Sequence, residues 1–419
     1  MKRQVLTCTL LTLSVALTAC NDDSDNDRFY ESKPAIPVNN IDNPVVATPV
    51  AYTQTDFSGI ADESVIMTYK MLGINGKETQ ATALVFTPEG TPPATGWPIV
   101  AWAHGTTGVA DQCAPSRKAL NDYIKAMIGG LLQAGYIVVA PDYEGLGEPS
   151  GKELHPFLNL KSEAYSITDA VVAARNYLGS QASNQWVAVG HSQGGQAALG
   201  AAQYAARASK MTYKGTVALA PASNFNLILT GGEQQAGQET DLDKKIGTLA
   251  SLDTFTALIV AGLRNPNPNP NPNLQYSQIF KMPTDEIAKN AETDCYDVLG
   301  QKFGTAMYAY AQSNNNSVNN YPRTQTNFMS IPVVKNFLEK DSQPLLVKVS
   351  TPVIIYQGSV DSTVPKAATD VLVALANQKQ TSVSYITDES NATKWDHGSV
   401  YALNIPNIIS DVKSLMPIQ

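Results

Sequence analysis

The chain has 419 residues, of which 43% are hydrophobic and 16% are charged, and its formal net charge is −8. This composition predicts a globular protein with a large core, organised as one large domain with an insertion. The acidic balance and the lack of a lysine or arginine cluster exclude a nucleic-acid-binding surface, and 4 cysteines are too few for a disulfide-rich scaffold.

The first twenty residues have the pattern of an export signal. Lys2 and Arg3 precede an apolar run over residues 5–17, which is too short to span a membrane. Leu17-Thr-Ala-Cys20 resembles the lipobox of bacterial lipoproteins, so residues 1–19 are predicted to be a signal peptide and Cys20 the acylated residue. Ordinary signal cleavage with Cys20 incidental is the alternative. We expect an exported protein, lipid-anchored to a bacterial membrane with Asn21 favouring the outer one, or else secreted.

Residues 20–50 are predicted to be a disordered tether. The stretch from residue 21 to residue 43 has four aspartates in its first part, followed by scattered prolines and asparagines. Low hydrophobicity and one-sided charge cannot support a packed core. Such a tether would hold a folded domain at a membrane surface without crossing the membrane.

From residue 51 onward, strand and helix patterns alternate. Residues 64–71 and 80–87 predict a hairpin around Asn75-Gly76. Strands are predicted at residues 97–103, 136–140, 186–189, 215–220, 353–357 and 383–386, and helices at 118–133, 162–177, 196–207, 366–377 and 400–416. Continuous apolar strands alternating with helices indicate an α/β fold, with a mostly parallel sheet covered on both faces.

The alternation breaks between residues 222 and 343. This segment contains helical patterns at 241–263 and 283–313 and an alternating asparagine and proline run at 265–273, which can form neither helix nor sheet. We predict a helical cap over residues 222–343, inserted into a core formed by residues 51–221 and 344–419. A second domain unconnected with the functional site is the alternative.

Gly190-His-Ser-Gln-Gly194 lies between a predicted strand and an alanine-rich helix. Strand, tight turn and helix are the context that a G-x-S-x-G nucleophile elbow requires, because the turn lifts the hydroxyl of Ser192 out of the sheet. The glycines are explained sterically, since a Cβ at either position would collide with the neighbouring strand or helix.

A serine nucleophile needs an imidazole to take its proton and a carboxylate to orient the imidazole. Of the 4 histidines, only His397 follows Ser192 in the chain. Asp361 follows the predicted strand 353–357, so the order Ser192, Asp361, His397 is that of an α/β-hydrolase triad. His397 as a surface histidine and Asp361 as a turn aspartate are the alternatives, and Asp388 is the runner-up acid.

The remaining histidines and the oxyanion donors are assigned by position. His104 and His155 precede the nucleophile, and the side chain of His191 is expected to point away from that of Ser192. The backbone N–H of Gln193 and one from Gly105-Thr106 are the predicted oxyanion donors, with Thr106 favoured. The hydroxyl of Thr106 or Thr107 is a third candidate.

Besides Cys20, Cys113 and Cys295 remain once the signal is removed. Two cysteines in an exported protein are expected to pair, here joining the loop after strand 97–103 to the cap, with two free thiols as the alternative. The histidines are dispersed without ligand spacing, so neither a metal nor an organic cofactor is predicted.

Four motifs in order resemble the secretory lipase family of the α/β-hydrolase superfamily: His104-Gly-Thr-Thr-Gly108, Pro141-Asp-Tyr-Glu-Gly-Leu-Gly147, Gly190-His-Ser-Gln-Gly-Gly-Gln196 and Gln357-Gly-Ser-Val-Asp-Ser-Thr-Val-Pro365. The similarity runs from about Phe57 to the C-terminus. The resemblance implies a serine ester hydrolase with Ser192, Asp361 and His397 as its triad and a helical cap over the acyl pocket. Residues 141–147 look like a motif at the rim of the site, in which Asp142 has no evident role beyond stabilising a turn.

We therefore expect a carboxylic ester hydrolase, a lipase or esterase, that acts on a small-molecule or lipid ester through an acyl-enzyme on Ser192. A serine peptidase of the same fold is one alternative, although the cap lacks an evident acidic pair to anchor an amine. A non-catalytic surface-binding protein with a hydrolase fold is the other, and the complete triad argues against it.

Overall fold

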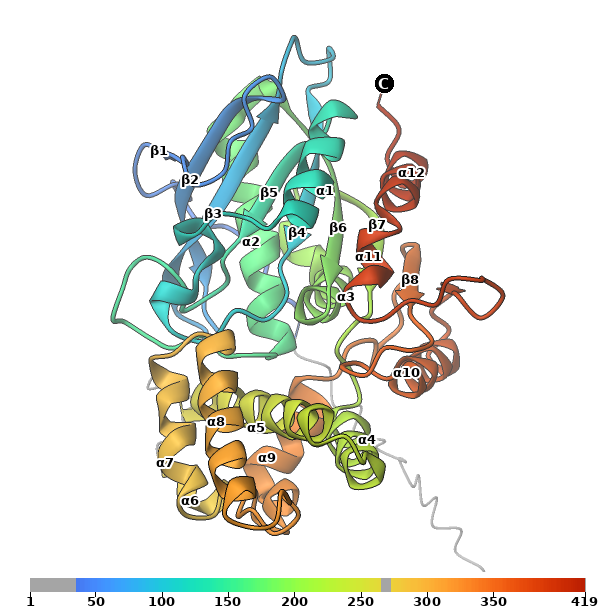
Figure 1. Cartoon of the computed structure of the whole chain (residues 1–419). Helices are drawn as coiled ribbons and strands as arrows, with labels where there is room; N and C mark the ends of the chain where they lie inside the picture. Colours follow the sequence, from blue (N-terminus) through green and yellow to red (C-terminus); the bar gives the residue numbers. More distant parts are fainter. Residues whose placement is uncertain (1–34, 265–272, 419) are drawn as a thin grey trace, which may run out of the picture. The chain divides into compact units, whose positions relative to one another are not determined.

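The computed structural model describes residues 35–264 and 273–418 (Figure 1). The chain divides into two units, Met1–Ala35 and Ile36–Gln419, and every helix and strand named below belongs to the second unit. The predicted signal peptide, Cys20 and the N-terminal part of the predicted tether lie outside the described residues. Most of the asparagine and proline run that begins at residue 265 also lies outside them.

A mostly parallel sheet of 9 strands forms the centre of the described chain, as the strand pattern predicts. The strand order is β1-β2-β3-β5-β4-β6-β7-β8-β9. Three neighbouring pairs are antiparallel: β1–β2, β2–β3 and β3–β5. The other pairs are parallel: β5–β4, β4–β6, β6–β7, β7–β8 and β8–β9. The strands are β1 (Val50–Ala51), β2 (Ala61–Leu72), β3 (Glu78–Pro88), β4 (Trp97–Ala103), β5 (Ile137–Pro141), β6 (Ala182–His191), β7 (Thr212–Leu219), β8 (Val353–Gln357) and β9 (Val383–Thr387).

Helices cover both faces of the sheet, which explains why the central strands are apolar throughout. Side chains of β4 alternate between two apolar clusters: Ile99 and Ala101 pack with α2 (Leu160–Leu178) and α3 (Gln193–Tyr204), whereas Val100 and Trp102 pack with α1 (Asp122–Gln133) and α12 (Ile405–Leu415). α10 (Lys366–Gln378) packs beside α3 and β8. This layering is the α/β-hydrolase arrangement predicted from the sequence.

The predicted hairpin is confirmed, because β2 and β3 pair antiparallel from Ala61↔Pro88 to Leu72↔Glu78. Gly76 lies at the connecting turn with φ +74° and donates its N–H to the carbonyl of Gly73. Only glycine adopts such a φ without strain, which is why Asn75-Gly76 is a good turn signal.

The parallel strands end at one edge of the sheet, and the motifs singled out from the sequence follow those ends. β4 leads into His104, β5 into Asp142, β6 into Ser192 and β8 into Gly358. The register brings neighbouring ends level, with Ala103 paired to Gly190 and His191 paired to Leu219. Side chains that are far apart in the sequence are therefore gathered at this edge.

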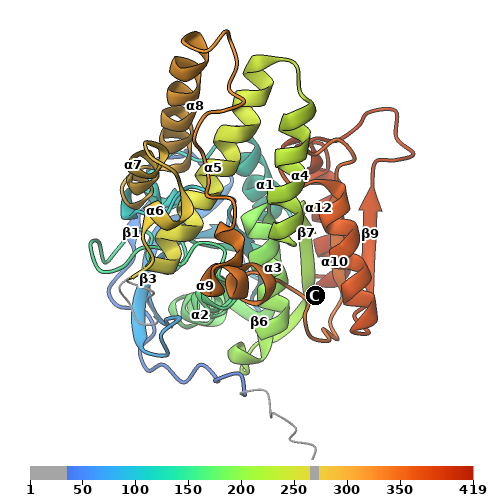
Figure 2. The same cartoon turned by 90° about the horizontal axis from the view of Figure 1, so that it is seen from below.

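The segment between β7 and β8 is helical, and an apolar cluster that includes Leu258, Leu299 and Phe303 holds its helices together. We refer to residues 222–343 as the cap; in Figure 2, α4 and α5 lie side by side. Its helices are α4 (Phe225–Gln238), α5 (Leu242–Arg264), α6 (Tyr276–Ile279), α7 (Thr284–Ala288), α8 (Tyr296–Gln312) and α9 (Pro332–Asn336).

α5 is long and apolar enough to cross a membrane by length and composition alone, but 67% of its most apolar window is buried within the protein. It packs against α4 and α8. Burial inside the cap thus accounts for the apolar composition of this helix.

Several element boundaries differ from the prediction. α1 begins at Asp122 and not at residue 118, because the side chain of Asn121 accepts a hydrogen bond from the N–H of Ile124 and caps the helix there. α4 has no counterpart in the predicted elements. The helix predicted over 400–416 is divided into α11 (Ser399–Ala402) and α12, with Pro406 in the first turn of α12.

The predicted tether is wrong at its C-terminal end, because residues 39–51 lie against the core. Asn39 Nδ2 donates to Asp169 Oδ1 at 2.8 Å, and its N–H donates to the carbonyl of Arg207 at 2.8 Å. β1 then pairs with β2. The polar composition suggested disorder, but Asn39 is satisfied by a buried Arg207–Asp169 ion pair that lies far along the chain.

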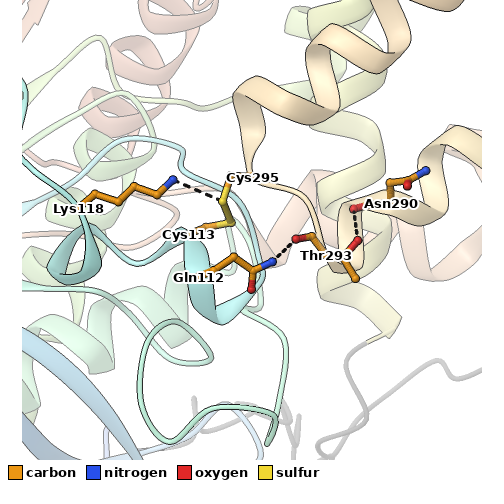
Figure 3. The surroundings of a disulfide bond; sticks show 6 residues. All are labelled: Gln112, Cys113, Lys118, Asn290, Thr293 and Cys295. Carbon is orange, nitrogen blue, oxygen red and sulfur yellow. Dashed lines mark hydrogen bonds between the residues drawn. A yellow bond between two sulfur atoms is a disulfide. The ribbon is translucent and has the colours of Figure 1, made fainter.

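Cys113 and Cys295 form the predicted disulfide (Figure 3), which joins the loop after β4 to the cap residue that precedes α8. Beside the disulfide, Gly108 forms an isolated β-bridge with Cys295, and the N–H of Tyr296 donates to the carbonyl of Thr107 at 2.9 Å. The bond links positions 182 residues apart. It fixes one end of α8 to the loop that follows His104.

Replacing Cys113 and Cys295 together by serine is expected to lower the free energy of unfolding by about 2–4 kcal/mol, because the crosslink restricts the unfolded chain. Urea denaturation followed by circular dichroism measures the change. Wild-type protein unfolded in the presence of a reductant should match the double variant, and equal unfolding midpoints for the oxidised wild type and the variant would contradict the expectation.

Candidate active site

Ser192 stands at a sharp turn between β6 and α3, which end and begin next to it. Its φ of 60° and ψ of −121° are rarely adopted by a residue with a side chain, so the turn stores backbone strain. The turn places Ser192 in the wall of a cavity at the carboxyl edge of the sheet. This is the elbow geometry that the sequence predicts.

The two glycines of the elbow are required by close backbone packing. A Cβ on Gly190 would lie 2.1 Å from the carbonyl oxygen of Gly194, and a Cβ on Gly194 would lie 1.9 Å from that of Ala103. Both distances are far below any possible contact between carbon and oxygen. α3 can therefore begin directly above β4 and β6 only if both positions lack a side chain.

His397 connects Ser192 to Asp361. His397 Nε2 lies 2.9 Å from Ser192 Oγ, and Nδ1 lies 2.8 Å from Asp361 Oδ2. Because a carboxylate only accepts hydrogen bonds, Nδ1 carries a hydrogen, and Nε2 of the neutral ring is free to accept the hydrogen of the serine hydroxyl. Three side chains predicted from separate motifs thus form one hydrogen-bonded chain.

Asp361 is held rigidly in the turn after β8. Its side chain is buried, and its Oδ1 accepts the backbone N–H groups of Thr363 at 2.9 Å and Val364 at 2.8 Å. These bonds leave Oδ2 directed at His397. The same carboxylate therefore stabilises its own turn and orients the imidazole.

Asp388, the runner-up acid, makes other contacts. Its carboxylate accepts the N–H of Ser359 at 2.8 Å and the N–H of Trp395. It thereby ties the loop after β8 to the loop that carries His397. Asp396 accepts the N–H groups of Gly398 and Ser399 and likewise serves its own turn.

His191 makes a contact that the sequence analysis does not predict. Its ring centroid lies 4.6 Å from that of His397, and its Nε2 lies 2.6 Å from the carbonyl oxygen of His397, to which it donates. Burial, followed by the charge of His397, lowers the pKa of His191 to about 3, so the ring stays neutral at neutral pH. His191, the residue before Ser192, thus holds the loop of His397 in place.

Gly105, Thr106 and Thr107 line the same cavity as Ser192. A Cβ on Gly105 would lie only 3.7 Å from Ser192 Cβ, so this loop passes directly beside Ser192. On the other side, Gln193 is the first residue of α3, and the N–H groups of a first helical turn have no acceptor within the helix. The two segments predicted to supply oxyanion donors therefore both adjoin Ser192.

His104 lines the same cavity as Ser192, and the ring nitrogens of His104 and His155 contact groups other than the Ser192 hydroxyl. Burial lowers the pKa of His104 to about 4, and its Nε2 lies 3.1 Å from the carbonyl oxygen of Asp142. His155 is also buried, and its Nε2 lies 2.9 Å from the side-chain nitrogen of Gln193. The sequence alone assigns no role to either histidine. The one sequence feature that points to them is their position, because His104 opens one of the quoted motifs and His155 follows another.

The cavity beside Ser192 has a volume of about 440 Å³ and opens at the carboxyl edge of the sheet. Its walls are mainly apolar, with contributions from the core strands, α1 and the cap: Leu84, Trp102, Ile124, Ile128, Ala140, Phe255 and Tyr296. A far smaller cavity of about 20 Å³ adjoins Ser192 on the side of α4. Of these two cavities, the one on the α1 side has the space for a long apolar group next to Ser192.

No group of three or more histidine, cysteine, aspartate or glutamate side chains suited to a metal ion occurs among residues 35–264 and 273–418. The histidines next to Ser192 are instead engaged with a serine, carbonyl groups or a carboxylate.

Comparison with known protein families identifies the family of the chain. The family model described as "Secretory lipase" matches residues 117–413, which is more than half of the chain. The chain belongs to the secretory lipase family. The match contains the three proposed triad residues and begins after the loop with Gly105 and Thr106. No curated protein sequence matches the chain.

Solved structures with the same fold include three that are each less than 20% identical to this secretory lipase family member. A Legionella pneumophila protein with a provisional hydrolase assignment has a TM-score of 0.64 at 18% identity, over 85% of this chain and 89% of its own. The rice cell wall degrading esterase LipA from Xanthomonas oryzae has a TM-score of 0.58 at 19% identity, over 84% and 89%. Candida antarctica lipase A in its closed state has a TM-score of 0.55 at 15% identity, over 90% and 82%.

Gly194→Ala is expected to destabilise this secretory lipase family member by at least about 3 kcal/mol, because the new methyl group must displace α3 from the end of β4. Thermal unfolding by calorimetry measures the loss. Gly247→Ala is the matched control, since this glycine lies within α5 with no atom within 4 Å of the added Cβ. A control that is as unstable as the elbow variant would contradict the steric explanation.

Proposed function

We propose that the chain is a serine carboxylic ester hydrolase, a lipase or esterase, that acts through an acyl-enzyme on Ser192. The observation that carries the proposal is the hydrogen-bonded chain from Ser192 through His397 to Asp361, with distances of 2.9 and 2.8 Å, in the wall of an apolar cavity. Membership of the secretory lipase family supports an ester as the substrate.

The first half-reaction forms the acyl-enzyme. His397 Nε2 takes the hydroxyl proton of Ser192 as Oγ attacks the ester carbonyl carbon, and Asp361 stabilises the imidazolium that results. The carbonyl oxygen becomes an oxyanion. When the carbon–oxygen bond to the alcohol breaks, His397 returns the proton to the alcohol, which leaves.

The second half-reaction releases the acid. His397 takes a proton from water, and the hydroxide attacks the acyl carbon of the Ser192 ester. The bond from this carbon to Oγ then breaks, and Oγ receives the proton from His397. The carboxylic acid departs, and the enzyme regains its starting state without a cofactor.

The oxyanion of both steps is assigned to the backbone N–H of Gln193 and one backbone N–H from Gly105-Thr106, with Thr106 favoured. Both segments border Ser192, and Gln193 opens α3, whose helix dipole adds to the stabilisation of negative charge. Donors that are fixed before the reaction need no reorganisation when the charge develops.

Residues 222–343 are proposed to act as a cap over this site, inserted in a core of residues 51–221 and 344–419. Phe255 and Tyr296 of the cap help to line the larger cavity. A small-molecule ester or a lipid ester would place its acyl chain on this apolar side. The smaller cavity beside α4 leaves little space for a bulky alcohol group unless the cap moves.

The family is one of secretory proteins, in agreement with predicted export. We further propose that Cys20 is acylated after residues 1–19 are removed, and that residues 21–35 link the lipid to the folded unit. Expression of the full chain in a bacterial host should place it in the outer-membrane fraction, and Cys20→Ala should shift it to the soluble or uncleaved fraction. Equal fractionation of the two proteins would refute the anchor.

Hydrolysis of p-nitrophenyl esters with short and long acyl chains tests the mechanism in a protein of residues 21–419. Ser192→Ala is expected to lower kcat/KM about 10⁴-fold or more, and Asp361→Asn about 10³- to 10⁴-fold, because the imidazole then loses its orienting carboxylate. The chain-length profile of the wild type separates a lipase from an esterase.

Asp388→Asn is the matched control, because it neutralises the runner-up acid that lies on the same loops but binds backbone groups instead of His397. Its kcat/KM should fall far less than that of Asp361→Asn when both are assayed below their unfolding temperatures. A folded wild type that cleaves no ester, or that cleaves peptides instead, would overturn the proposed substrate class.

A further inference from the structure

The motif at residues 141–147 has no part in the mechanism above, yet one of its residues occupies a central position. Tyr143 is fully buried and has φ +77°, a strained conformation for a large side chain. Its ring lies between two imidazoles, 4.2 Å from the centroid of His104 at an interplanar angle of 26° and 5.5 Å from that of His155 at 19°. The three rings form a buried stack.

One end of the stack holds the loop after β4. The hydroxyl of Tyr143 donates to the carbonyl oxygen of His104 at 3.0 Å, and His104 Nε2 lies 3.1 Å from the carbonyl oxygen of Asp142. The peptide that carries the His104 carbonyl continues directly into Gly105. The stack therefore fixes the start of the segment to which one oxyanion donor is assigned.

The other end holds the start of α3. His155 Nδ1 lies 2.8 Å from the carbonyl oxygen of Glu144, which can only accept, so Nδ1 donates and Nε2, which faces an amide nitrogen, is the acceptor. Gln193 Nε2 donates one hydrogen to this Nε2 at 2.9 Å and its other hydrogen to Glu163 Oε1 at 2.7 Å. Gln193 is only 1% exposed, so its side chain acts within the protein and not on substrate.

The surrounding residues make this arrangement rigid. Glu163 is fully buried, and its Oε1 also accepts the N–H of Leu158 at 3.0 Å. Gly145 has φ +78°, and a Cβ there would lie 2.5 Å from the backbone nitrogen of His155. The glycine at this point of the motif allows the chain that carries His155 to approach the stack.

We propose that Tyr143, His155 and Gln193 position the two oxyanion donors relative to each other. The stack joins the Gly105-Thr106 segment to the Gln193 side chain. The same set of buried residues therefore holds both segments that carry the donors. This role rests on the proposed function. The three are positioning residues, because they act through the backbone N–H groups and, apart from the N–H of Gln193, do not touch the substrate.

The test uses two variants with matched controls in the protein of residues 21–419. Tyr143→Phe removes the bond to the His104 carbonyl and keeps the ring, and Tyr69→Phe removes an equally buried hydroxyl that donates to the carbonyl of Ser166 at 2.9 Å. Gln193→Met removes the amide, and Gln196→Met removes a buried amide on the same helix that donates to the carbonyls of Leu158 and Ser342.

Each protein is assayed for kcat and KM with one p-nitrophenyl ester, for the Ki of an alkyl boronic acid and for its unfolding temperature. The boronic acid forms a tetrahedral adduct with serine that places an oxygen in the oxyanion site. We expect Tyr143→Phe and Gln193→Met to lower kcat about tenfold, with KM changed less than about twofold. The boronate Ki should rise in proportion to the fall in kcat/KM.

The controls should lower the unfolding temperature by similar amounts while kcat and the boronate Ki stay within about twofold of wild type. If Tyr143→Phe matches Tyr69→Phe in kcat and Ki, or if kcat falls without a rise in Ki, the positioning role is overturned while the proposed function stands. A wild type that hydrolyses no ester overturns the proposed function and this role with it.

Discussion

The contact between the start of α3 and the end of β4 determines how the rest of the molecule is arranged around Ser192. A side chain at Gly194 would place its Cβ 1.9 Å from the carbonyl oxygen of Ala103, so the helix and the strand touch through backbone alone. This contact brings the free N–H groups of a helix N-terminus next to the loop that follows β4. It also forces the strained turn at Ser192, and the sheet and the helices packed on it have to stabilise that turn.

The sequence was sufficient for features that depend on local pattern and chain order. Continuous apolar strands predicted the parallel sheet, and the order of Ser192, Asp361 and His397 identified three side chains that the structure places in one hydrogen-bonded chain. Features that depend on distant contacts could not be read in this way. Asn39 looked like part of a disordered segment because its buried partners lie in α2 and after α3. The contact of His191 with His397 follows from the path of the loop after β9, which no local pattern reveals.

Buried carboxyl groups organise the loops of the site. Asp142 accepts the N–H of Ser116 at 2.9 Å and the hydroxyl of Thr82 at 2.6 Å, and Glu144 accepts the N–H of Ile74. Burial raises the pKa of Asp142 to about 6 and that of Glu144 to about 7. A group whose pKa is raised by folding stabilises the fold at low pH, and this contribution is lost as the pH rises through the raised value. Buried carboxyl groups therefore lower the stability of the fold near neutral pH. Their hydrogen bonds hold the loops near Ser192 in order, which is a reason for keeping them in spite of this cost.

The place where the cap is inserted has a consequence for divergence. The insertion leaves the sheet after β7 and returns to it at β8, and these strands are immediate neighbours with a continuous parallel register. The sheet therefore sets no limit on the length or composition of the chain between them. This segment could be lengthened, shortened or rebuilt, and the proposed substrate preference changed with it, while the register that aligns Ser192 with the loop after β8 stays the same. The disulfide between Cys113 and Cys295 is one of the points at which this inserted segment is attached to the loops of the sheet.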